Sequence, residues 1–144
     1  MAKGSSGKRQ FSAVVFDLDQ TLIDSSKAEP LRKARVWREI YPMIPQLPIY
    51  PGIADVLAWL DATNIPVGIA TSSPKTYCEK VVAHHKWNVL AVSCYHCTTQ
   101  HKPHPAPIQK VAELMGVDPT KVVSIGDDPR DIVASLAAGS FAVA

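Results

Sequence analysis

The chain has 144 residues, the length of a single domain. Apolar residues make up 47% of it and charged residues 19%, a globular balance that excludes a disordered or fibrous chain. With 15 Lys and Arg against 13 Asp and Glu the formal net charge is only +2, so bulk electrostatics give no support for a nucleic-acid or membrane partner.

Residues 1–10 are predicted to form a flexible tail, because they contain the stretch Gly4-Ser5-Ser6-Gly7. They carry charge but lack the apolar segment of a secretion signal. No later stretch has the roughly 18 continuous apolar residues that a membrane-spanning helix requires. The three cysteines, an odd number, argue against a disulfide framework. We therefore expect a cytoplasmic protein that does not associate with membranes.

Beyond the tail, short apolar runs alternate with amphipathic stretches, which predicts one domain over residues 11–144. The runs expected to be strands are 13–16, 67–70, 89–92, 122–125 and 141–144. Helical spacing of apolar residues appears at Ile53, Val56, Leu57 and Leu60, around Tyr77 and Val81, over 108–115, and over 131–138. This alternation predicts an α/β fold, with a single Rossmann-like parallel sheet flanked by helices.

Residues 25–50 interrupt the alternation and are predicted to form a short helical lid, with one helix over 29–41 and a Pro-rich extended connection after it. Four cations surround Trp37 in this helix: Arg32, Lys33, Arg35 and Arg38. They either attract an anionic substrate or nucleic-acid backbone, or form an ordinary solvated helix face. Both interpretations remain open at this point.

Polar residues follow the predicted strands where each strand ends. They comprise Asp17 and Asp19 after the first strand, Thr71 and Ser72 after the second, Lys102 before the third helix, and Asp127 and Asp131 after the fourth strand. The carboxyl ends of parallel strands share one edge, where ligands bind in open α/β sheets. Carboxylate oxygens suit Mg²⁺, and a lysine beside helix N-terminal amides suits a phosphate group.

In this pattern the chain resembles the haloacid dehalogenase (HAD) superfamily, from residue 13 to residue 144. The family's four motifs are matched in order by Asp17-Leu18-Asp19-Gln20-Thr21, by Thr71, by Lys102 and by Gly126-Asp127 with Asp131. An acid at Asp19 distinguishes the phosphatase branches from the dehalogenases and phosphonatases. The resemblance thus implies a Mg²⁺-dependent phosphomonoester hydrolase with a reduced cap.

The resemblance also implies a role for each matched residue. Asp17 would be the nucleophile that forms an aspartyl-phosphate, and Asp19 the general acid and then the general base. Phosphate would be held by Thr71 and by the amides of Leu18, Asp19 and Ser72, with Lys102 offsetting negative charge. Mg²⁺ would be bound by Asp17, the Asp19 carbonyl and Asp127, with Asp131 in support.

Several alternatives remain beside this prediction. A small phosphorylated substrate is favoured, but the reduced cap leaves room for a nucleic-acid-associated phosphatase or binding module, and for a homo-oligomer that covers the site. A phosphate-binding protein without turnover is a further alternative. Relatives commonly continue with a further loop and strand after the fifth strand, which leaves truncation of this chain open.

Two local patterns also have more than one interpretation. Asp128 is either a supporting acid of the site or the N-cap of the helix that begins near Pro129. The residues Cys94, Cys97, His101 and His104 have the types of zinc ligands, but their spacing is shorter than in zinc-finger modules. A structural zinc is therefore the less favoured interpretation of this loop.

Overall fold

The computed structural model describes residues 10–144, and the predicted tail lies outside this range except for Gln10. Its centre is a five-stranded parallel sheet in the order β4-β3-β2-β5-β6. The strands are β2 (Ala13–Phe16), β3 (Val67–Ala70), β4 (Ala91–Ser93), β5 (Val122–Ile125) and β6 (Phe141–Val143). The predicted fold class, a Rossmann-like parallel sheet flanked by helices, is confirmed.

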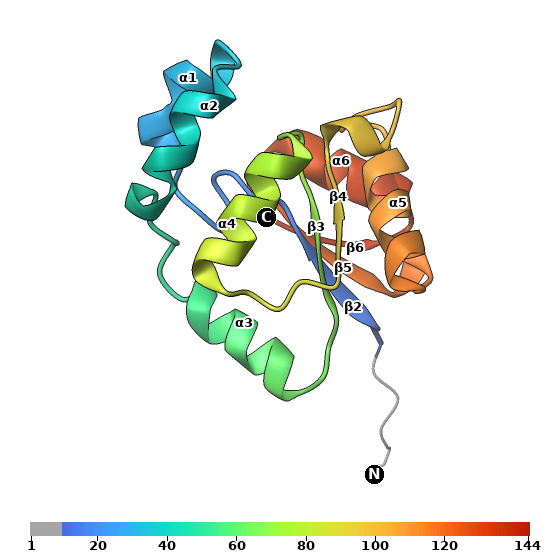
Figure 1. Cartoon of the computed structure of the whole chain (residues 1–144). Helices are drawn as coiled ribbons and strands as arrows, with labels where there is room; N and C mark the ends of the chain where they lie inside the picture. The colour runs from blue at the N-terminus through green and yellow to red at the C-terminus, as the bar shows by residue number, and fades with distance from the viewer. Residues whose placement is uncertain (1–9) are drawn as a thin grey trace.

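Two pairs of helices cover the two faces of this sheet (Figure 1). On one face lie α3 (Ile53–Ala62) and α4 (Lys75–His85), and on the other lie α5 (Ala106–Met115) and α6 (Pro129–Ala137). Alternate residues of each strand face opposite sides, so Val14 and Phe16 enter the α3–α4 core while Ala13 and Val15 enter the α5–α6 core. Among residues 10–144, no helix is both long and apolar enough to cross a bilayer.

Two of the predicted strands differ slightly from the observed ones. The strand predicted over 89–92 is β4, which begins at Ala91 and includes Ser93, fully buried and paired with Ala70. The polar Ser93 ended the apolar run in the sequence, although the sheet continues through it. The last strand ends at Val143 rather than at residue 144.

The predicted apolar face of α3 is confirmed only in part. Leu60 is buried, and Ile53 and Leu57 pack against the core. Val56, however, is 42% exposed.

The prediction of one helix over 29–41 is wrong. The segment instead forms α1 (Glu29–Lys33) and α2 (Trp37–Ile40), separated by Arg35 in the left-handed conformation at φ 59°. The amides of Arg35 and Val36 donate to the carbonyls of Arg32 and Leu31, the hydrogen bonds of a Schellman helix end. Apolar periodicity gave no sign of this stop, because Arg35 stands where glycine is the usual residue.

The connection after α2 is also more ordered than predicted. Residues Tyr41–Gln46 form the 3₁₀ helix η2, which contains Pro42 and Pro45, rather than an extended chain. Its Ile44 is buried, as are the flanking Ile40 and Leu47. The lid is therefore packed into the same core as α3 and α4.

A ring contact and a side-chain amide fix the position of this lid. The Trp37 ring lies 5.3 Å from the Tyr77 ring of α4, between centroids. At the start of the lid, the amide of Ser25 donates to Oε1 of Gln20 at 2.8 Å. The lid thus lies beside α4, where Figure 1 shows α1 and α2 at one end of the molecule.

Because the lid shares the main core, an Ile40→Ala substitution is expected to lower the free energy of global unfolding by about 2–5 kcal/mol. Urea denaturation followed by circular dichroism measures this loss. The control is Glu39→Ala, an exposed neighbour on the same helix, for which a change within about 0.5 kcal/mol is expected. A loss below about 1 kcal/mol for Ile40→Ala would show that the lid unfolds separately from the core.

Candidate active site

The chain turns sharply as it leaves the central strand β2, and this turn places the first two acids. The amide of Asp17 donates to the Ile125 carbonyl at 2.9 Å, which continues the pairing with β5. The carbonyl of Leu18 then accepts from the amides of Thr21, Leu22 and Ile23, closing a compact loop. The Leu18 side chain is fully buried, and anchors the turn between Asp17 and Asp19.

The predicted side chains meet at this edge of the sheet. A cavity of about 250 Å³, here named the edge cavity, is lined by Asp17, Asp19, Gln20, Glu29, Arg32, Thr71, Ser72, Lys102, Asp127, Asp128, Arg130 and Asp131. Every residue predicted to act through its side chain is in this set. Leu18, predicted to act through its amide, is part of the turn below the cavity rather than of its lining.

Lys102 lies between two of the carboxylates. Its Nζ is 3.2 Å from Oδ1 of Asp17 and 2.5 Å from Oδ1 of Asp131, and it donates to the Ala70 carbonyl at 2.8 Å. The side chains of Lys102 and Asp131 are only 8% and 6% exposed. A buried ammonium group requires such partners, because an unpaired charge in the interior is strongly disfavoured.

The backbone around Asp131 is shaped to fit this acid. Its Oδ2 accepts from the amide of Asp128 at 3.1 Å, while Asp128 Oδ1 accepts from the amide of Arg130 at 2.8 Å, which makes a capping box at the start of α6. Hydrogen bonds from Arg130 also lower the pKa of Asp128. The N-cap interpretation of Asp128 is confirmed.

Gly126 leaves the space that Asp131 occupies. A Cβ atom at this position would lie 2.4 Å from Cγ of Asp131. No side chain larger than that of glycine fits here without moving the acid. The glycine of the Gly126-Asp127 motif is therefore required for steric reasons.

Asp17, Asp127 and Asp131 could together hold a metal ion. Among residues 10–144, they are the one group of three or more acidic, histidine or cysteine side chains that lie close enough together to do so. Their oxygens lie within 4.8 Å of one another. Asp127 is exposed and its Oδ1 accepts from Thr21 Oγ1 at 3.1 Å, which leaves its second oxygen available. Oxygen ligands of this kind fit Mg²⁺, which is commonly held by one or two carboxylates together with water and phosphate oxygens.

The environment of Asp17 disfavours its charged form. Burial of the carboxylate, opposed by Lys102 and reinforced by Asp131 and Asp19, raises the pKa of Asp17 to about 7. A divalent cation beside it would lower this pKa, since positive charge stabilises the carboxylate. The site is therefore suited to binding a cation.

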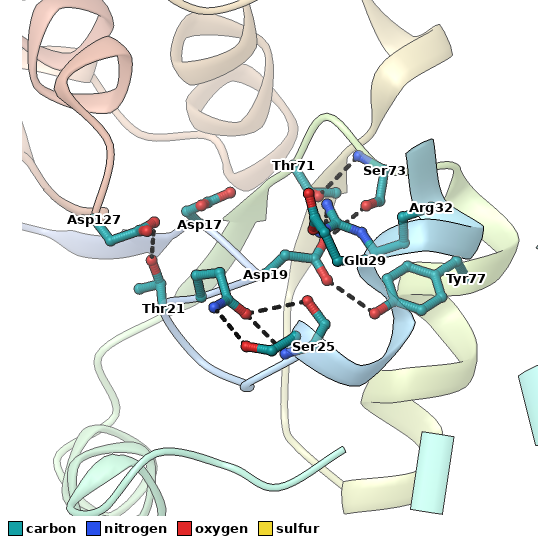
Figure 2. Close-up of polar contacts among 12 residues, drawn as sticks. Asp17, Asp19, Thr21, Ser25, Glu29, Arg32, Thr71, Ser73, Tyr77 and Asp127 are labelled. Carbon is teal, nitrogen blue, oxygen red and sulfur yellow. Dashed lines mark hydrogen bonds and ion pairs between the residues drawn. The ribbon is translucent and has the colours of Figure 1, made fainter. Parts of the chain in front are cut away.

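Asp19 points away from this group and is held by three donors. Its carboxylate accepts from Ser73 Oγ at 2.7 Å and from the Tyr77 hydroxyl at 2.8 Å, and lies 3.3 Å from Nη2 of Arg32 (Figure 2). Burial, followed by the charge of Asp19, raises the pKa of Tyr77 and keeps its hydroxyl protonated as a donor.

Sequence reasoning missed Ser73 and Tyr77 as partners of Asp19. Tyr77 was assigned only to the apolar face of its helix. The hydroxyl group of Tyr77 was the available signal. A tyrosine on the buried face of a helix needs a hydrogen-bond partner for its hydroxyl.

The hydroxyl residues after β3 do not cap α4. The N-cap of that helix is Pro74, and no side chain caps the helix there. Instead, Thr71 Oγ1 accepts from the amide of Ser73 at 3.0 Å within the loop. Thr71 and Ser72 therefore remain on the wall of the edge cavity.

The residues considered as zinc ligands do not converge. Sγ of Cys94 lies 2.6 Å from Sγ of Cys97, but both histidines have other partners. Nε2 of His101 lies 2.7 Å from the Tyr95 carbonyl, and Nδ1 of His104 accepts from the amide of Ala106. The described residues thus give no support for the structural zinc alternative.

The fold and the acidic cavity together define an α/β domain whose chemical groups gather at one edge of a parallel sheet. A profile of the haloacid dehalogenase-like hydrolases matches residues 31–144, and the chain belongs to this family. It is 30% identical over 139 residues to the N-acetylmuramic acid 6-phosphate phosphatase of Pseudomonas aeruginosa, covering 94% of this chain and 60% of that protein.

Other relatives agree with this assignment. The chain is 32% identical over 98 residues to the phosphoglycolate phosphatase of Escherichia coli, which covers 63% of this chain and 37% of that enzyme. It therefore spans less than two thirds of the length of both curated relatives. A HAD-superfamily hydrolase from Geobacter sulfurreducens shares the fold, with a TM-score of 0.78 and 20% identity over 97% of this chain and 89% of that one.

The raised pKa of Asp17 predicts a specific pH dependence of stability in the metal-free protein. Between about pH 4 and pH 7 the unfolded chain has lost this proton while the folded protein retains it, so folding stability falls as the pH rises. Asp17→Asn removes the effect. The unfolding free energy of the variant minus that of the wild type should rise across this window, by up to about 4 kcal/mol, and level off above pH 7.

Urea denaturation in EDTA at intervals from pH 4 to pH 8 measures this difference. The exposed Asp55→Asn substitution is the control, and it should show no such rise. Asp17→Asn also loses the contact with Lys102. This loss changes the difference in unfolding free energy by a constant amount, which does not vary with pH over this range. A difference that is constant with pH would contradict the burial of a proton on Asp17.

Proposed function

We propose that this protein is a Mg²⁺-dependent phosphomonoester hydrolase that acts through an aspartyl-phosphate intermediate. The observation that carries the proposal is the placement of Asp17 on the edge cavity, 3.2 Å from Lys102 and within 4.8 Å of Asp127 and Asp131. A nucleophilic carboxylate beside a fixed cation and a cation-binding acid pair is suited to phosphoryl transfer. The names of the curated relatives, both phosphatases, support the same reaction.

In the first step an oxygen of Asp17 attacks phosphorus, and the bond from phosphorus to the ester oxygen breaks. Asp19 donates a proton to that departing oxygen, and in the second step takes one from the water that hydrolyses the acyl phosphate. Ser73 and Tyr77 hold the Asp19 carboxyl group at the cavity wall. The products are inorganic phosphate and an alcohol.

Charge on the transferring group would be stabilised from several directions. Lys102 and Thr71, with the amides of Leu18, Asp19 and Ser72, would bind the phosphoryl oxygens. Mg²⁺, held by Asp17, the Asp19 carbonyl and Asp127, would neutralise charge on the nucleophile and the phosphoryl group. Asp131 supports this arrangement through Lys102, because its own oxygens already accept from Lys102 and the Asp128 amide.

The proposed substrate is a small phosphorylated molecule, as the volume of the edge cavity favours. Arg32 of the lid is turned inward to Asp19, so the lid cations do not form a single outward face for nucleic acid. A cytoplasmic location is part of the proposal, because three cysteines, an odd number, argue against a disulfide framework.

Phosphate release from a pool of small phosphomonoesters tests the proposal. We expect turnover with Mg²⁺ and none with EDTA. Asp17→Asn should lower kcat at least about a thousandfold, since it removes the nucleophile. Asp19→Asn should lower kcat by about 10²–10⁴, the usual contribution of general acid–base catalysis.

The matched control is Asp55→Asn, an exposed acid of α3, which should retain wild-type turnover. Release that persists in EDTA or in Asp17→Asn would overturn the mechanism. Binding of Mg²⁺ and phosphate without turnover would indicate a phosphate-binding protein. Tight, salt-dependent binding of oligonucleotides would point instead to a nucleic-acid substrate.

A further inference from the structure

A second cavity adjoins the edge cavity beneath the lid. This lid pocket has a volume of about 320 Å³ and is lined by Glu29, Arg32, Lys33, Arg35, Trp37, Ser72, Ser73, Pro74, Tyr95 and His96. Glu29, Arg32 and Ser72 line both cavities, so the two lie side by side. If a phosphoryl group occupies the edge cavity, as proposed above, the rest of the substrate faces the lid pocket.

The two cavities carry opposite charge. Six carboxyl side chains and three cationic ones line the edge cavity, an excess of negative charge that suits a metal ion. Three cationic side chains, Arg32, Lys33 and Arg35, and a single carboxylate, Glu29, line the lid pocket. An excess of positive charge in a partly enclosed site attracts an anion.

Arg32 has hydrogen-bonding capacity left for a ligand. Its Nη2 lies 3.3 Å from Asp19 and its Nη1 donates to Glu29 at 3.0 Å. Its Nε is buried and has no partner among the described residues. Because an unsatisfied buried donor is costly, an acceptor at this position would be stabilising.

Arg35 is held over the other wall of the lid pocket by an aromatic stack. Its guanidinium carbon lies 5.9 Å from the centroid of the Tyr95 ring, and the Tyr95 ring stacks on His101 at 4.2 Å between centroids. The break between α1 and α2 places Arg35 there, through its left-handed conformation. Arg35 makes no ion pair with any acid of residues 10–144, in contrast to Lys33, which lies 3.9 Å from Glu29.

From these observations we infer that the lid pocket is a leaving-group subsite that selects phosphomonoesters carrying a second anionic group, such as a carboxylate. Arg32 and Arg35 are the specificity-determining residues of this subsite. Trp37 and Tyr95 supply apolar surface for the few carbon atoms that connect the anion to the ester oxygen. The inference rests on the proposed phosphatase function, because that function places the phosphoryl group of the substrate in the edge cavity and its leaving group in the lid pocket.

The test compares two series of alkyl phosphates with two to four methylene groups, one ending in a carboxylate and the other in a hydroxyl group. At the best length, kcat/KM for the carboxylate should exceed that for the alcohol at least tenfold. Arg32→Gln should bring this ratio close to one. Arg35→Asn should lower it severalfold, and asparagine tolerates the left-handed backbone at this position.

Arg38→Asn is the matched control, because it removes an exposed cation of the same lid that lines neither cavity. It should leave the ratio unchanged. The ratio separates specificity from general loss of turnover, since both series share the same reacting group. Equal kcat/KM for the two series at every length, or an equal fall of the ratio in Arg38→Asn, would overturn the subsite.

Calorimetric binding of the same compounds to Asp17→Asn in Mg²⁺ tests the subsite without turnover. Tighter binding of the carboxylate series, weakened by Arg35→Asn, would support the subsite. This holds even if the wild type released no phosphate, and in that case only the proposed reaction would fail. Turnover of both series without any carboxylate preference would leave the reaction in place and overturn the subsite. Absence of both turnover and preference would overturn both.

Discussion

The buried ion pairs of Lys102 are the interaction on which the rest of the site depends. Its ammonium group is placed between Asp17 and Asp131 at the carboxyl edge of the sheet, and burial of this kind is tolerated only with paired charges. The glycine at position 126 and the capping box at Asp128 keep Asp131 in place. The same cation opposes the effect of burial on Asp17, whose pKa is nevertheless raised to about 7.

The lid connects this charged centre to the hydrophobic core. Trp37 packs on Tyr77, Tyr77 donates to Asp19, and Arg32 approaches Asp19 from α1. The lid, a short insertion, thereby contributes apolar packing against the core and polar contacts to Asp19. Because its core residues are buried together with those of α4, the position of Arg32 relative to Asp19 depends on the packing of the whole lid.

The distribution of charge divides the proposed substrate-binding region in two. The edge cavity has an excess of carboxylates, and the adjoining lid pocket has an excess of cations. The first environment suits a metal ion with the phosphoryl group, and the second an anion on the leaving group. The net charge of the chain, only +2, conceals this local separation.

The sequence alone determined the parallel α/β class and the clustering of Asp17, Asp127 and Lys102, because strand ends in such sheets meet at one edge. It did not show that Arg35 ends α1, since that stop depends on backbone conformation rather than on apolar spacing. Nor did it show that Ser73, Tyr77 and Arg32 converge on Asp19. Those contacts join the lid, the β3 loop and α4, and only tertiary packing brings such distant segments within hydrogen-bond distance.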